Sequence, residues 1–167
     1  MLTPDTQFFT KAAPELAKRI RRGDHGALLL GPGSDAPDIE FEDIDGKVYH
    51  LSVFTGKPLY IDLWASWCGW CVEGLPNVKE IAHRYKDKLT VVSVDCGDSE
   101  EAWQNGIKKY GMDWVQVYNS KADAVDSKYA VLGYPGFYLI DPEGKIKMMA
   151  FGEPAHFVEK IGELISE

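Results

Sequence analysis

Two apolar runs separated by a helical repeat constrain the fold of this chain more than any other feature. Leu59–Trp64 is apolar apart from Asp62, and Leu89–Val94 is a second run of the same kind. Between them, apolar residues recur at helical spacing from Val72 to Lys86. A strand, a helix and a strand in this length form a crossover connection, so we expect the two runs to be parallel strands in the core of a sheet.

The flanking segments extend this unit into a mixed α/β sheet. Asp38–Glu42 and Lys47–Leu51 alternate polar and apolar residues around the turn Asp45-Gly46, which indicates a hairpin. The other expected elements are a helix from Ser99 to Tyr110, a strand at Trp114–Tyr118, a short helix at Ala122–Tyr129, a hairpin of Phe137–Ile140 and Lys145–Phe151, and a helix at Pro154–Ser166. We therefore expect a three-layer α/β sandwich with a mixed central sheet and helices on both faces.

The chain divides into an extension and one domain. Ala13–Ile20 is expected to be helical, with Pro14 in the first turn and Gly23 as a stop, and Gly31–Ser34 has the composition of a loop. We therefore interpret residues 1–32 as an N-terminal helical extension and residues 33–167 as a single domain. The domain begins with the β-hairpin described above.

Charge and hydropathy exclude several partners. Acidic residues outnumber basic ones by 26 to 18, which gives a net charge of −8 and argues against nucleic acid. The basic cluster Lys18–Arg22 is too short to reverse this balance. No apolar run reaches the length of a membrane span, and Met1–Asp5 does not begin a signal peptide. We expect membrane contact only through a tether outside this chain.

A pair of cysteines carries the chemical information. Cys68 and Cys71 stand where the first apolar run ends and the helical repeat begins. Cysteines three positions apart on an opening helical turn can bring their sulfurs within bonding distance. The free N–H groups and partial positive charge of a helix start favour thiolate over thiol. We expect Cys68 to attack a disulfide and Cys71, one turn deeper, to resolve the mixed disulfide.

Asp62 is the second candidate for a catalytic role. A carboxylate within an apolar strand is costly unless it is neutral or paired. The six-residue offset from Cys68 could place Asp62 beneath the dithiol, where a carboxyl with a raised pKa would exchange a proton with Cys71. The alternative is that Asp62 faces a solvated edge of the sheet.

Aromatic residues and a proline are candidates for substrate contacts. Trp67 and Trp70 flank the cysteines and are expected to form an apolar rim around the sulfur, with Gly69 between them. In Gly133–Gly136, a cis bond between Tyr134 and Pro135 would present the Tyr134 backbone to an extended polypeptide. Periodicity alone favours an ordinary turn proline here.

These motifs together resemble a known family. The chain is similar to the thioredoxin superfamily, and within it to the TlpA/ResA group of extracytoplasmic thioredoxin-like proteins, over residues 33 to 167. The resemblance rests on Gly56–Cys71 with Leu75-Pro76, on Ala36–Ile39 with Asp45–Lys47, and on Gly133–Pro135 before Phe137–Asp141. It implies a thioredoxin-like fold, Cys68 as nucleophile, Cys71 as resolving thiol, Pro135 as a cis-proline and Asp62 at the buried acid position.

The same resemblance implies a biological setting. We expect protein thiols and disulfides as substrates, an upstream redox partner protein, a reductive direction, a monomer, and a periplasmic or otherwise extracytoplasmic location. The chain departs from the family pattern in having Gly-Trp between the cysteines, Gly74 in place of an acidic residue, and Gly136 after the proline. The redox potential is therefore not transferred from the family.

Two other classes of function remain as alternatives. The dithiol could bind copper with a distant histidine such as His156, although the four histidines are dispersed and no four-ligand zinc pattern is present. A thiol peroxidase is a second alternative, because peroxiredoxins share the early Ala-Pro-Asp and Asp-Gly-Lys pattern. Cys96 is interpreted as a buried small hydrophobe. We expect no metal site and no cofactor.

Overall fold

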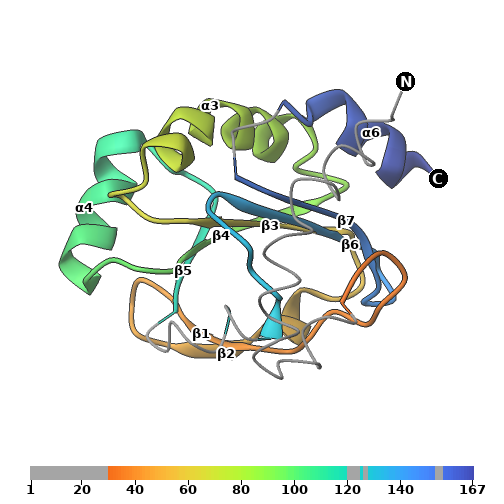
Figure 1. Cartoon of the computed structure of the whole chain (residues 1–167), viewed down its shortest axis with the longest axis horizontal. Helices are drawn as coiled ribbons and strands as arrows, with labels where there is room; N and C mark the ends of the chain where they lie inside the picture. The colour runs from red at the N-terminus through yellow and green to blue at the C-terminus, as the bar shows by residue number, and fades with distance from the viewer. Residues whose placement is uncertain (1–29, 120–124, 126–127, 153–155) are drawn as a thin grey trace.

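The computed structural model describes residues 30–119, 125, 128–152 and 156–167. Its strands are β1 (Glu40–Glu42), β2 (Val48–His50), β3 (Leu59–Trp64), β4 (Thr90–Asp95), β5 (Val115–Tyr118), β6 (Gly136–Ile140) and β7 (Ile146–Phe151). In this part of the chain they form one mixed sheet in the order β2-β1-β5-β4-β3-β6-β7. The helices α3 (Gly69–Arg84), α4 (Glu100–Tyr110) and α6 (Val158–Ser166) lie together on one side of it (Figure 1).

The expected crossover is confirmed at the centre of the sheet. β3 pairs in parallel with β4, from Leu59 opposite Thr90 to Trp64 opposite Asp95, and α3 connects the two strands. On its other side β3 pairs antiparallel with β6. Since β3 has a neighbour on both sides and layers above and below, all six of its residues are buried.

Alternate residues of β3 point to opposite faces of the sheet. Tyr60 and Trp64 point to the face covered by the helices, where they pack with residues of α3, α4 and α6. Ile61 and Leu63 point to the opposite face. Burial of side chains of this size stabilises the fold by about 2 kcal/mol each.

The hairpin β1–β2 joins the sheet where Glu42 pairs with Tyr118 of β5, and it curls over the face opposite the helices (Figure 1). β1 pairs antiparallel with β2 around Gly46, as expected, and Ile39 and Phe41 enter the core beneath Ile61 and Leu63. The 3-10 helix η1 (Leu51–Phe54) and the helical residue Val125 with Tyr129 complete this layer. Most of the helix expected at 122–129, and residues 1–29 of the expected extension with its helix at 13–20, lie outside the described residues.

The ends of α4 agree with the sequence, whereas α3 ends at Arg84 and not at Lys86, and α6 starts later than expected. Ser99 caps α4, because its Oγ accepts a hydrogen bond from the Ala102 N–H at 3.2 Å, and Gly111 ends the helix with a φ of +59°. The sequence predicts the last helix from Pro154, but α6 begins at Val158. Phe157 stands at its N-cap position instead and packs its ring edge-to-face on Phe137, at 5.6 Å between centroids. Among the described residues, no helix combines the length and apolar character that a bilayer crossing requires.

Gly106 on α4 provides a test of the packing behind the cysteines. A Cβ on Gly106 would lie 2.9 Å from the Trp64 ring, which is fully buried. We expect Gly106→Ala to lower the free energy of unfolding by about 1–2 kcal/mol, although alanine favours helix, because a rigid indole has to move. Urea denaturation measures this. Asn105→Ala, at an exposed position of the same helix, is the matched control and should not destabilise; equal effects would contradict the packing argument.

Candidate active site

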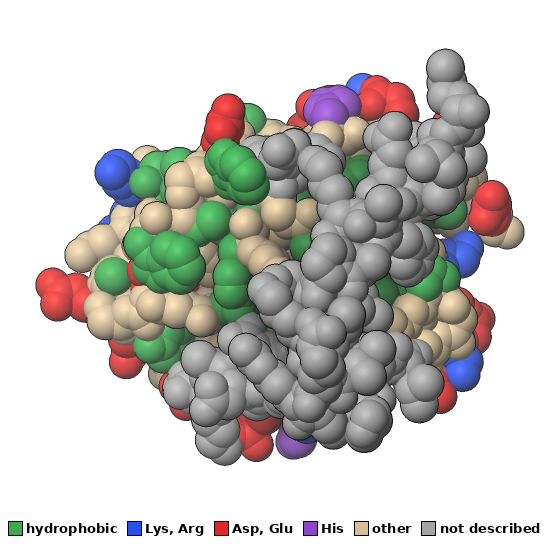
Figure 2. Space-filling model, in the orientation of Figure 1, with side chains coloured by type: hydrophobic (Ala, Val, Ile, Leu, Met, Phe, Trp, Pro, Cys, Tyr) green, Lys and Arg blue, Asp and Glu red, His purple; other side chains and the backbone are tan. Residues whose placement is uncertain are grey.

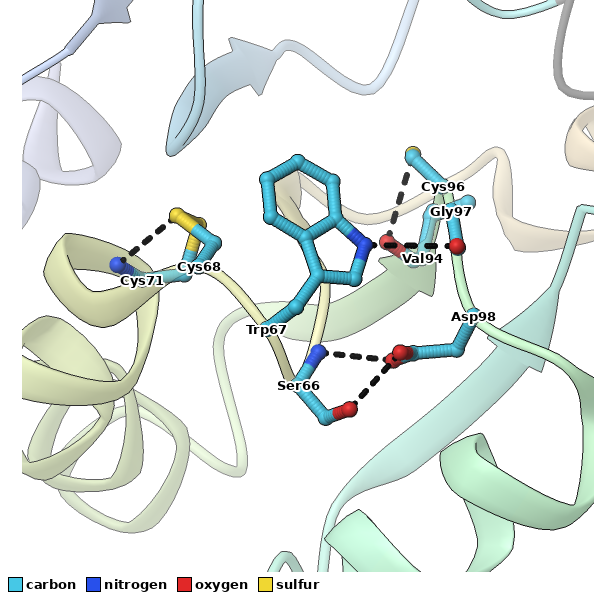
Figure 3. The surroundings of a disulfide bond; sticks show 8 residues. All are labelled: Ser66, Trp67, Cys68, Cys71, Val94, Cys96, Gly97 and Asp98. Carbon is cyan, nitrogen blue, oxygen red and sulfur yellow. Dashed lines mark hydrogen bonds between the residues drawn. A yellow bond between two sulfur atoms is a disulfide. The ribbon is translucent and has the colours of Figure 1, made fainter.

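Cys68 and Cys71 lie at the start of α3 and form a disulfide (Figure 3). Cys68 is the N-cap residue, and its Sγ accepts a hydrogen bond from the Cys71 N–H at 3.2 Å. The side chains are 8% and 2% exposed respectively, so Cys68 is the more accessible of two buried sulfurs. The helix start directs the Cys71 N–H at this sulfur, and a donor at a helix N-terminus favours a thiolate.

Asp62 lies on the same face of β3 as the helices, and the solvated-edge alternative is wrong. Its side chain is 2% exposed, between Tyr60 and Trp64 on a strand flanked by β4 and β6. Ser93 donates a hydrogen bond to Oδ2 at 2.7 Å, and the Trp114 Nε1–H donates to the Ser93 Oγ at 2.8 Å. Burial raises the pKa of Asp62 to about 7, and the Ser93 hydrogen bond opposes this rise.

Three aromatic residues are neighbours of the disulfide: Trp67 and Trp70 flank the cysteines in the chain, and Tyr134 packs against the cluster that contains these cysteines. Trp67 and Trp70 are 64% and 50% exposed, large fractions for tryptophan, and Gly69 between them is exposed too. Tyr134 is half-buried and meets the Trp67 ring edge-to-face, at 6.4 Å between centroids. Figure 2 shows hydrophobic side chains gathered on the surface near the start of α3. This surface can contact an apolar segment of another polypeptide.

The bond between Tyr134 and Pro135 is cis, as the family resemblance implied. Pro135 is buried, and its carbonyl accepts a hydrogen bond from the Gly152 N–H at 2.8 Å. The register pairs Leu63 with Gly136, so Pro135 lies at the end of β3 that leads to Cys68. The structure thus brings Tyr134 and the cysteine pair to the same edge of the sheet.

A turn after β4 contacts the loop before Cys68, a contact that the sequence pattern did not predict. Asp98 accepts hydrogen bonds from the Ser66 N–H at 2.6 Å and the Ser66 Oγ at 2.7 Å, and the Gly97 carbonyl accepts one from Trp67 Nε1 at 3.2 Å (Figure 3). A signal was available: parallel strands end at the same edge, so acidic residues after the second strand lie near the residues after the first.

Neither Cys96 nor any described histidine belongs to a metal-type cluster with the dithiol. Cys96 is buried on the opposite face of the sheet, and its thiol lies 3.4 Å from the Val94 carbonyl. His156 is exposed and pairs with Glu159 on α6 at 3.5 Å. Within the described ranges, no cluster of three or more His, Cys, Asp or Glu residues has the geometry of a metal site.

Comparison with known proteins gives a consistent result. Residues 32–149 match the family described as AhpC/TSA. The thiol–disulfide oxidoreductase ResA of Bacillus subtilis is 32% identical over 128 residues, which are 76% of this chain and 71% of ResA. The thioredoxin domain of a thiol–disulfide oxidoreductase from Bacteroides vulgatus aligns with a TM-score of 0.75 and 30% identity, over 81% of this chain and 99% of that one. A thiol:disulfide interchange protein from a Bacteroides species aligns with a TM-score of 0.74 and 30% identity, over 83% of this chain and 92% of that one.

Proposed function

The chain belongs to the AhpC/TSA family and is a thioredoxin-like thiol–disulfide oxidoreductase, and on this premise we propose that Cys68 and Cys71 are its working dithiol. The observation that carries this assignment is the disulfide at the start of α3, where one sulfur is the N-cap and the other lies deeper. The helix start favours the Cys68 thiolate, and the greater burial of Cys71 suits the resolving role.

The reaction proposed is a two-step exchange. The Cys68 thiolate attacks one sulfur of a substrate disulfide, forms a mixed disulfide and releases a substrate thiolate. Cys71, having lost its proton to Asp62, then attacks the Cys68 Sγ and releases the second substrate thiolate. Two electrons pass to the substrate, and the protein keeps the Cys68–Cys71 disulfide. An upstream redox partner protein then reduces this disulfide by the reverse sequence.

The substrates proposed are protein disulfides, bound along the rim formed by Trp67, Gly69, Trp70, Tyr134 and Pro135. Exposed aromatic rings beside a nearly buried sulfur give a polypeptide an apolar contact next to the reacting atom. The Tyr134 backbone at the sheet edge is the contact proposed for an extended segment. The net charge of −8 supports a protein partner over a nucleic acid.

The direction and the setting are part of the same proposal. We place the protein outside the cytoplasm, as a monomer working reductively, because of its resemblance to the TlpA/ResA group. A redox titration of the Cys68–Cys71 couple tests the direction. A midpoint reduction potential of about −270 mV, typical of reducing members of the superfamily, supports the reductive direction. A midpoint of about −120 mV contradicts it.

An insulin-reduction assay tests the activity itself. The wild-type protein with a dithiol reductant is expected to turn over insulin disulfides, with stoichiometric loss and recovery of the Cys68–Cys71 disulfide. The same preparation, purified anaerobically, is analysed for metal and mixed with peroxide. A stoichiometric metal without disulfide turnover, or rapid peroxide consumption by Cys68 without it, would overturn the proposal.

Cys71→Ser is expected to trap substrates. Without the second thiol, the mixed disulfide on Cys68 has no intramolecular route to resolution, so it should survive from seconds to hours, as uncatalysed exchange does. Mass spectrometry after non-reducing separation identifies the trapped partners. The double variant Cys68→Ser/Cys71→Ser is the control and should trap none; equal trapping by both variants would contradict the assignment of Cys68.

A further inference from the structure

The turn Asp95–Asp98 binds two consecutive residues of the loop that leads to Cys68. Asp98 accepts both the backbone N–H and the hydroxyl of Ser66, at 2.6 and 2.7 Å. Next to it, the Gly97 carbonyl accepts the Trp67 indole N–H, and a Cβ on Gly97 would lie 3.0 Å from that indole. The turn thus fixes the backbone two residues before Cys68 and the ring beside it (Figure 3).

Asp98 is itself held by Asp95. Oδ1 of the fully buried Asp95 accepts the N–H groups of Gly97 and Asp98, at 3.2 and 2.9 Å. The Tyr118 hydroxyl donates to the Asp98 carbonyl at 2.8 Å. The two carboxyl groups belong to the same turn, and each affects the pKa of the other. Oδ2 of Asp95 is buried and has no hydrogen-bond partner in the described part of the chain, so a negative charge on this carboxyl is costly and a proton on it is favoured.

Among the described residues, the charged groups that act on Asp95, Asp98 and the neighbouring Tyr118 are all acidic. The groups whose charges act on the neighbouring Tyr118 are Asp95, Asp98, Glu42 of β1 and Glu100 of α4, and all of them are acidic. Ser66 on the loop after β3 contributes neutral donors only. Two ionised carboxylates in this turn would therefore repel each other, and none of the charges that act on them from the described residues would offset this.

We propose that Asp98 is a positioning residue for the Cys68 loop and that a proton shared with Asp95 keeps Asp98 bound to Ser66. The proposal rests on the function proposed above, because it takes Cys68 as the nucleophile. With one shared proton the pair carries a single charge and binds the loop. When both groups ionise, repulsion moves Asp98 away from Ser66, and both Trp67 and Cys68 lose their fixed positions.

The charge state of the pair places this change at alkaline pH. Burial raises the pKa of Asp95 to about 8, and the hydrogen-bonded Asp98 adds to the rise. Partial burial acts to raise the pKa of Asp98, but hydrogen bonds with Asp95 and Ser66 outweigh it and lower the pKa. The shared proton is therefore present below about pH 8 and lost above it.

The first test is a pH titration of the oxidised protein, in which the two active cysteines do not titrate. The Ser66 amide resonance is expected to shift with a midpoint near pH 8 in wild type and in Asp62→Asn. In Asp95→Asn the shift should be absent, because the new amide keeps an acceptor for the two N–H groups but has no proton to lose. Persistence of the shift in Asp95→Asn would overturn the proposal.

The second test measures exchange rates. Asp98→Ala is expected to lower the rate of insulin reduction about tenfold, and Ser66→Ala about threefold, since hydrogen bonds to a charged acceptor are lost. The double variant should be no slower than Asp98→Ala alone, because both changes remove the same contact. The matched control is Asp87→Asn, an exposed aspartate in the turn before β4, which should keep the wild-type rate.

The outcomes separate this proposal from the one on which it rests. If wild type does not reduce insulin, the proposed function fails. If wild type is active and Asp98→Ala and Ser66→Ala are equally active, the positioning role fails alone. Thermal unfolding of the oxidised variants shows whether Asp98→Ala folds; if it does not, Ser66→Ala and the Ser66 amide titration still decide.

Discussion

Cys68→Ser is expected to reduce the rate of insulin-disulfide reduction by more than about a thousandfold, as loss of an enzyme nucleophile commonly does. A serine hydroxyl at the N-cap does not ionise near neutral pH, so the helix start has no anion to stabilise. Cys71 does not replace the lost sulfur, because its side chain is 2% exposed and lies behind the N-cap position. The measurement is the initial rate at neutral pH with reductant in excess.

Cys96→Ala is the matched control for this variant. Cys96 is also a buried cysteine, but it lies on the opposite face of the sheet and outside the disulfide. We expect it to keep the wild-type rate. Residual exchange in Cys68→Ser together with loss of activity in Cys96→Ala would show that the assignment of the dithiol is wrong.

Asp62→Asn is expected to stabilise the oxidised protein at alkaline pH by up to about 4 kcal/mol, which is what a rise in pKa from 3.8 to about 7 corresponds to. Because the folded protein binds this proton more tightly than the unfolded chain, the contribution to stability is complete below pH 3.8. It is lost as the pH rises to about 7, and the cost of a buried carboxylate then remains. An asparagine carries no such charge at any pH, and its side-chain oxygen can still accept the Ser93 hydrogen bond.

Urea denaturation at pH 5, 7 and 9 measures this difference. The gain of Asp62→Asn over wild type should grow from pH 5 to pH 7 and change little from pH 7 to pH 9. Asp95 makes its own pH-dependent contribution, but wild type and variant share it. Parallel stability profiles for the two proteins would contradict the raised pKa, and an unchanged pH profile of thiol reactivity would remove Asp62 from the proton transfer.

The central fold could be predicted because the local pattern and the tertiary environment agree. The two apolar runs, which form β3 and β4, are buried on both faces of the sheet. Their composition alone therefore indicates parallel strands with a helix between them. Ser99 and Gly111 specify the ends of α4 through contacts within a few residues. The start of the last helix could not be predicted in this way. α6 starts where Phe157 packs on Phe137, and that contact joins two separate elements of the chain.

The candidate site could be predicted only where it depends on residues that are close together in the sequence. Cys68 and Cys71 are three residues apart, so their chemistry is visible in the sequence. Asp62 could be identified as unusual, but its burial and its bond to Ser93 depend on strand pairing. The contact of Asp98 with Ser66 spans 32 residues and depends on where two parallel strands end. Acidic residues after a strand are common on protein surfaces, so no feature of the neighbouring sequence marks Asp98 as a contact of the Cys68 loop.

Because Cys68 is the N-cap residue of α3, the redox state of the cysteine pair is coupled to the stability of the first turn of this helix. The Cys68 sulfur accepts the Cys71 N–H while it is bonded to the other sulfur. Once the disulfide opens, the same atom becomes an anionic cap, and charged acceptors make stronger hydrogen bonds than neutral ones. Gaining two electrons should therefore tighten the first turn of α3, and any binding partner that unwinds this turn would make the protein a weaker oxidant.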